Sequence, residues 1–283
     1  MPGTKKVKLE RTRDVARIWL DRPDVHNAFD DEVIAALAAA VDEANQHPRV
    51  RVIVLGGRGR SFSAGADLEW MRRAAGWTPE QNSQDAARLA GMLRALAASP
   101  KVTVARVHGA AVGGGMGLVA ACDMAIASER ARFGLSEVKL GLIPAVISPH
   151  VIEKVGVGRA RALFVTGQRF DAAFAERIGL VARVVPDEEA LDLAIEEVIA
   201  EVRTSGPDAV RAAKELVRIV PTLTEDQVDA WTAEQIAGRR ATPEAREGMA
   251  AFLEKRAPAW VARRDDPSEE HFPAPEDDAE EDD

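Results

Sequence analysis

The sequence contains a single cysteine, Cys122, so it cannot form an intramolecular disulfide. This excludes the disulfide-stapled secreted domains, and we expect a reducing, cytoplasmic location. No stretch reaches the roughly 18 apolar residues of a transmembrane helix, so no membrane partner is expected. Residues 1–6 lack the apolar core of a secretion signal, and no export is predicted.

Lys and Arg are absent from residues 265–283, which hold eleven acidic residues. The formal net charge of the chain is −9, and without those acids the rest carries +2. Such a Pro-rich acidic segment cannot build a core, so residues 261–283 are predicted to form a disordered, solubilising tail. The nearly neutral body gives little electrostatic drive toward nucleic acid, and no nucleic-acid partner is expected.

The remaining sequence alternates between apolar runs typical of strands and amphipathic segments typical of helices. This alternation predicts an α/β core over residues 1–200, followed by a helical region over residues 201–260. The 283 residues are 46% hydrophobic and 29% charged, as in an ordinary globular enzyme. The predicted strands are 15–20, 50–55, 102–107 and 124–128. The predicted helices are 31–44, 83–98, 113–121, 150–157, 159–166, 171–178, 187–204, 207–220, 224–239 and 243–256.

A glycine run, Gly113-Gly-Gly-Met-Gly117, follows one predicted strand and opens a helix. Glycines there let a substrate approach backbone N–H groups, and the helix N-terminus favours a developing anion. The run is not a dinucleotide fingerprint, since the sixth position from Gly113 is Leu118, and no Gly-Lys-Ser/Thr follows as in a Walker A loop. Close packing of a helix on a strand remains the competing interpretation.

Two further segments are also candidates for the site. Residues 58–68 carry small residues after a buried strand and end at Asp67, which either helps to bind a ligand or caps the next helix. Glu137 lies in a largely apolar stretch, where burial would raise its pKa and suit it to proton transfer. The alternative for Glu137 is an exposed or paired surface carboxylate.

Taken together, these segments resemble the crotonase (enoyl-CoA hydratase/isomerase) superfamily. The resemblance covers residues 5–258 and includes motifs elsewhere in the chain. They are His26-Asn-Ala-Phe29, Cys122-Asp123, Leu163-Phe-Val-Thr-Gly-Gln-Arg-Phe-Asp-Ala172, Ile178-Gly-Leu-Val181 and Gly248-Met-Ala-Ala-Phe-Leu-Glu-Lys255. The resemblance implies a spiral of ββα units with a helical C-terminal trimerisation region. It also implies an acyl-CoA thioester as partner and a homotrimer or homohexamer.

The resemblance implies roles for particular residues. The N–H groups of Ala64 and Gly114 would form an oxyanion hole for the thioester enolate, with Glu137 as catalytic acid/base. Coenzyme A is carried by the substrate, so no separate cofactor is implied, and the scattered histidines suggest no metal site. The substrate-binding residues would be Val25, Asn27, Ala28, Ala64, Gly65, Ala66, Asp67, Leu68 and Lys255. The acyl pocket would include Gly117, Ala145 and Val146.

The chain departs from the pattern at Gly117, where typical hydratases carry a second glutamate. The segment 143–149 also differs from the usual glycine-rich stretch. We therefore expect a hydratase that uses Glu137 alone, similar to the methylglutaconyl-CoA hydratase branch of leucine degradation. A Δ3,Δ2-enoyl-CoA isomerase needs only one carboxylate and is the first alternative. A non-catalytic CoA- or RNA-binding protein is the alternative from another class.

Overall fold

A computed structural model describes residues 6–262. The predicted acidic tail, apart from residues 261 and 262, lies outside these residues. The main sheet has six strands in the order β1-β2-β3-β4-β6-β9, and a smaller sheet has the order β5-β7-β8. β1 pairs antiparallel with β2 and β7 with β8, whereas the other neighbours run parallel. The strands are β1 Val7–Thr12, β2 Val15–Leu20, β3 Val52–Gly57, β4 Val102–Val107, β5 Ala110–Val112, β6 Met124–Ser128, β7 Arg132–Gly134, β8 Arg169–Asp171 and β9 Arg183–Val185.

Helices cover both faces of the main sheet. Alternate residues of β2 and β3, such as Ile18 and Leu55, pack on the face of α1, α3 and α4. Their neighbours, such as Val15 and Val54, pack against α7 on the other face. The body helices are α1 Asp31–Gln46, α2 Leu68–Ala74, α3 Pro79–Ala97, α4 Gly114–Ala121, α5 Ser148–Thr166, α6 Ala172–Arg177 and α7 Glu188–Thr204, with 3-10 turns η1 Pro23–Val25 and η2 Glu137–Leu140.

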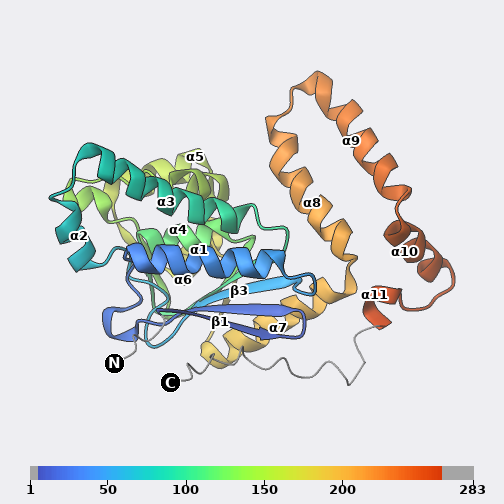
Figure 1. Ribbon diagram of the computed structural model, residues 1–283, viewed down its shortest axis with the longest axis horizontal. Coiled ribbons are helices and arrows are strands. Elements are labelled where there is room, and N and C mark those ends of the chain that lie inside the picture. Colours follow the sequence, from blue (N-terminus) through green and yellow to red (C-terminus); the bar gives the residue numbers. More distant parts are fainter. Residues whose placement is uncertain (1–5, 263–283) are drawn as a thin grey trace, which may run out of the picture.

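The C-terminal helices leave the body as an arm, which Figure 1 shows on the side away from α2. The arm contains α8 Pro207–Ile219, η3 Val220–Thr222, α9 Glu225–Arg240 and α10 Pro243–Leu253, followed by the short α11 Ala259–Ala262. Lys214 of α8 ties the arm to the body, since its Nζ donates to Oδ2 of Asp123 at 2.6 Å. Together with α7, this arm confirms the predicted helical character of the C-terminal part. The domain limits at residues 200 and 260 remain predictions.

The predicted α/β architecture is confirmed, and several boundaries are refined. Residues 148–166 form two helical segments that meet at a kink at Gly156, whose φ of 77° is not helical, in agreement with the predicted helices 150–157 and 159–166. Part of the predicted helix 171–178 is instead the end of β8. Each of the short strands β5, β7, β8 and β9 has only three residues. Three residues are too few for a detectable apolar alternation.

Candidate active site

The segments 61–67 and 109–117 meet beside the carboxyl ends of the neighbouring parallel strands β3 and β4. The N–H of Ser63 donates to the carbonyl of Ala110 at 2.8 Å, and the N–H of Val112 donates to that of Ser63 at 3.0 Å. A Cβ on Gly115 would lie 2.5 Å from the Ser63 oxygen, and one on Gly65 would lie 2.9 Å from the Val112 oxygen. The glycines of both motifs therefore allow two backbones to touch.

Two backbone N–H groups beside this contact are not used by the fold. Gly114 is the first residue of α4, so its N–H has no partner within the helix. Phe29 and Ala66 form a parallel bridge: the N–H of Phe29 donates to the carbonyl of Gly65, and the N–H of Asp67 donates to the carbonyl of Phe29. In this pattern the N–H of Ala66 points away from Phe29. Within residues 6–262, neither the N–H of Ala66 nor that of Gly114 donates to a backbone carbonyl outside the helices and strands.

The structure contradicts the prediction that Ala64 supplies an oxyanion-hole donor. Its N–H donates to the carbonyl of His26 at 2.9 Å, and a backbone amide has only one proton to donate. Ala66, two residues later, lines the same cavity as Gly114 and has its N–H free within the described chain. Sequence alone did not distinguish the two alanines, because the hydrogen bond to His26 depends on how a distant loop folds.

Glu137 begins the 3-10 turn η2, directly beside the glycine run. A Cβ on Gly113 would lie 3.2 Å from its Oε1. Its Oε2 is buried and has no hydrogen-bond partner among the described residues. Burial raises the pKa of the Glu137 carboxyl, although a hydrogen bond from its own backbone opposes the shift. Glu137 is half-buried with its Oε2 enclosed, and it forms no salt bridge among the described residues.

A cavity of about 170 Å³ brings these groups together. Its wall is apolar apart from Glu137 and the indole of Trp70, whose Nε1 is buried without a partner in the described chain. Two predicted pocket residues, Ala145 and Val146, line it, whereas Gly117 is buried behind Ile147. The lining residues are Phe29, Ala66, Trp70, Leu89, Gly114, Glu137, Ile143, Pro144, Ala145, Val146 and Ile147. Leu89 comes from α3, and its apolar spacing in the sequence is that of an ordinary core residue.

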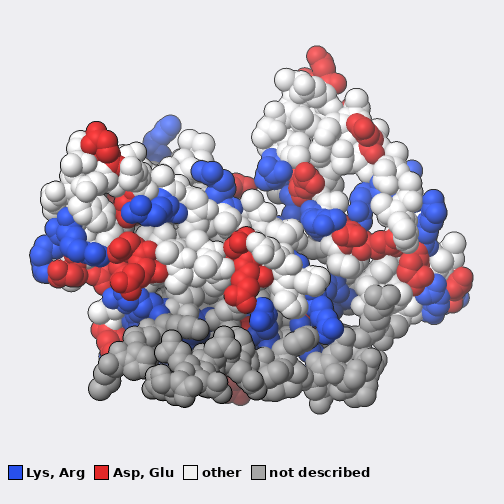
Figure 2. All heavy atoms as spheres, in the orientation of Figure 1, with Lys and Arg blue, Asp and Glu red and all other residues white. Residues whose placement is uncertain are grey.

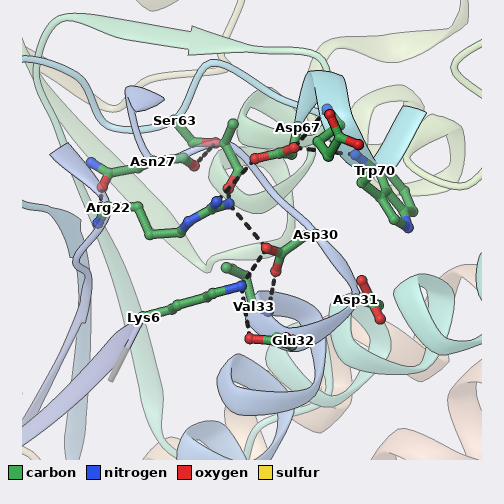
Figure 3. A network of polar contacts seen from close by, with 12 residues as sticks. Lys6, Arg22, Asn27, Asp30, Asp31, Glu32, Val33, Ser63, Asp67 and Trp70 are labelled. Carbon is green, nitrogen blue, oxygen red and sulfur yellow. Dashed lines mark hydrogen bonds and ion pairs between the residues drawn. The ribbon is translucent and has the colours of Figure 1, made fainter. Parts of the chain in front are cut away.

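Two residues predicted to bind the substrate hold the loops in place. Asn27 is 1% exposed; its Oδ1 accepts from the N–H of Arg22, and its Nδ2 donates to the carbonyls of Arg58 and Ser61. Asp67 caps α2 and also pairs with Arg22 at 3.0 Å. Figure 3 shows Arg22 reaching toward both Asp30 and Asp67. These side chains are bonded within the scaffold, and so are the backbone N–H groups of Asn27 and Asp67, which donate to the carbonyls of Arg22 and Phe29.

The remaining predicted binding residues are dispersed. Leu68 and Val25 are exposed, at 77% and 42%, whereas Ala28 is buried. Lys255 follows α10 at the end of the arm, and Figure 1 places α10 on the far side of the body from α2. Lys255 therefore does not join the other predicted residues within one chain.

Residues 6–262 contain no cluster of three or more His, Cys, Asp or Glu side chains that could hold a metal ion. No helix in the same range has the length and apolar character needed to cross a membrane.

The fold and this site define an α/β protein in which a half-buried carboxyl lines one cavity with two residues whose backbone N–H groups have no backbone partner in the described chain. Comparison with known proteins names the family: the family model for enoyl-CoA hydratase/isomerase matches residues 10–263, and the chain belongs to this family. It is similar to the short-chain-enoyl-CoA hydratase of Clostridium acetobutylicum, at 32% identity over 88% of this chain and 95% of that protein. The crotonyl-CoA hydratase of Syntrophomonas wolfei is 31% identical over 92% of this chain and 99% of its own.

Solved structures give the same result. The crystal structure of an enoyl-CoA hydratase from Shewanella pealeana superposes with a TM-score of 0.87 at 39% identity, covering 90% of this chain and 96% of that one. A likeness of this extent confirms the predicted crotonase-type fold.

Proposed function

We propose that the protein is an enoyl-CoA hydratase that adds water across the 2,3 double bond of an acyl-CoA thioester. The observation that carries this proposal is the buried Oε2 of Glu137, which has no hydrogen-bond partner among the described residues, in the cavity lined by Ala66 and Gly114. A carboxyl without an ion pair can exchange protons with a bound substrate. The alternative of a non-catalytic binding protein gives no reason to bury such a group at an energetic cost.

The chemistry needs a proton acceptor and a site for negative charge. Glu137 takes a proton from water while the water oxygen forms a bond to the β-carbon. The electron pair of the double bond moves toward the thioester, whose oxygen accepts hydrogen bonds from the N–H groups of Ala66 and Gly114. Glu137 then returns the proton to the α-carbon, which completes the addition of one water molecule. Fixed donors at the oxygen stabilise the enolate more than the ground state.

Isomerisation of a 3-enoyl-CoA is the second candidate, and the observation that favours it is the lone carboxyl. One acid suffices to carry a proton from the α-carbon to the γ-carbon. The relatives named above are hydratases, which supports hydration.

The cavity supports a short acyl chain of mainly apolar character. A glutaconyl ester, as in the methylglutaconyl branch, would place a second carboxylate among apolar side chains with the indole N–H of Trp70 as a donor. Burying an ionised carboxylate there is costly without a cation. We therefore place crotonyl-type esters first and glutaconyl esters second.

The arm supports assembly with further copies of the chain, as in a homotrimer or homohexamer. Three apolar side chains of the arm are strongly exposed, a pattern that is typical of an interface. They are Val217 of α8, at 71%, and Phe252 and Leu253 of α10, at 83% and 79%. Figure 2 shows much of the upper part of the arm free of charged side chains. Assembly would also give Lys255 a route to a neighbouring subunit's coenzyme A. Light scattering in solution tests the proposal, and a monomeric mass would contradict it.

A substrate panel tests the reaction. The purified protein is incubated separately with crotonyl-CoA, 3-methylglutaconyl-CoA and a 3-enoyl-CoA, and the conjugated enoyl absorbance is followed. Hydration predicts a fall with a 2-enoyl ester. A rise from the 3-enoyl ester, with no fall from the other two, would contradict hydration and establish the isomerase.

A further inference from the structure

Ile147 fills the space that a side chain at position 117 would need, in the wall of the site. A Cβ on Gly117 would lie 2.3 Å from Cγ2 of Ile147 and 2.9 Å from its Cβ. Both distances are far below van der Waals contact, so a side chain at position 117 requires Ile147 to move. Ile147 is 3% exposed, and it is the N-cap residue of α5, with its carbonyl accepting from the N–H of Val151. Its position is therefore set by the start of that helix.

The contact lies close to where the acyl chain must run. Gly114 and Gly117 are three residues apart in α4, so they share a face and are separated by about 4.5 Å along the helix axis. A thioester oxygen held at the N–H of Gly114 is three bonds from the β-carbon of its acyl chain. The β-carbon and its substituents therefore come within contact distance of the side chain that covers Gly117. That side chain is Ile147, which also lines the cavity.

We propose that Ile147 determines which acyl chains this site hydrates. It forms the wall beside the β-carbon and admits only small substituents there, and it fills the volume that a carboxylate on position 117 would occupy. The site is thus restricted to a single acid by packing between α4 and α5 as well as by the absence of a second glutamate. This proposal rests on the proposed hydratase function.

Shortening Ile147 tests the selectivity. Ile147→Ala opens the wall, so the ratio of kcat/KM for hex-2-enoyl-CoA to that for crotonyl-CoA is expected to rise about tenfold. Val157→Ala is the matched control, since Val157 lies on the same helix, is 61% exposed and lines no part of this cavity. Its ratio should equal that of the wild type. An unchanged ratio in Ile147→Ala would overturn the proposal.

A double-mutant cycle tests the packing without relying on activity. Gly117→Ala should lower the melting temperature strongly when Ile147 is present and much less in the Ile147→Ala background. Equal losses in both backgrounds would show that the two residues do not compete for space. When Gly117→Glu replaces Gly117→Ala in this cycle, the double variant with Ile147→Ala should melt at a higher temperature than Gly117→Glu alone.

The two tests also separate this proposal from the hydratase assignment. A wild-type protein that hydrates no enoyl-CoA would remove the proposed function and its selectivity. Hydration by the wild type, with a ratio that Ile147→Ala does not change, would remove only the role of Ile147.

Discussion

The N–H of Ala64 donates a 2.9 Å hydrogen bond to the carbonyl of His26, whereas the N–H of Ala66 faces away from the neighbouring Phe29 strand. His26 and Asn27 both have left-handed backbone conformations, with φ of 53° and 55°. A non-glycine residue adopts this conformation at an energetic cost, so the surrounding contacts must hold it. The hydrogen bond from Ala64 is one of these contacts, which gives Ala64 and Ala66 different roles.

Replacing the backbone amide by an ester distinguishes the two roles, because an ester has no N–H. An ester at position 66 is expected to lower kcat about 100- to 1,000-fold with little change in melting temperature. An ester at position 64 should mainly lower the melting temperature, since it removes the contact to His26. The opposite pattern, with kcat lost for the ester at position 64 and retained for the ester at position 66, would show that Ala64 supplies the oxyanion-hole donor.

Removing the side chain of Asn27 should destabilise the loop that carries Phe29. Asn27→Ala leaves the N–H of Arg22 and the carbonyls of Arg58 and Ser61 without their partner. We expect a loss of about 2–4 kcal/mol in the free energy of unfolding, measured by urea denaturation. Asn82→Ala, in the exposed first turn of α3, is the control and should change it by less than about 0.5 kcal/mol. Equal stability of the two variants would show that Asn27 does not hold the loop.

Protonation of Glu137 should make the stability of the fold depend on pH. Burial raises its pKa in the folded chain above the unfolded value of about 4.3, so the folded state binds the proton more tightly. Its contribution to stability is complete below the unfolded pKa and is lost as pH rises through the folded pKa. The melting temperature of Glu137→Gln minus that of the wild type should therefore increase with pH over this window and then become constant. A difference that decreases over the same window would mean that the folded pKa is lowered.

Sequence reasoning recovered the elements whose signals are local. The predicted helix 31–44 is one of them: Asp30, directly before it, accepts from the N–H of Val33 and caps α1. The start of α4 within the glycine run was likewise local, and so was the placement of Glu137 in an apolar stretch. These features depend on a few neighbouring residues and were predictable for that reason.

The remaining parts of the site depend on contacts between distant segments. The choice between Ala64 and Ala66 follows from pairing with residues 26–29, and Ile147 covers Gly117 only because α5 packs against α4. The substitution of glycine for glutamate was visible in the sequence, but its steric partner was not. Asp67 was a candidate cap in the sequence and does cap α2, whereas the internal bonds of the Asn27 side chain are visible only in the fold.

We propose that Glu137 is the only acid/base that the reaction needs, and the substitution Glu137→Gln tests this role. Glutamine keeps the size of the side chain but cannot take a proton from water. Hydration of crotonyl-CoA should fall about 100- to 10,000-fold, while calorimetry shows an acyl-CoA dissociation constant close to that of the wild type. Hydration at the wild-type rate by Glu137→Gln would show that Glu137 is not the acid/base of the reaction.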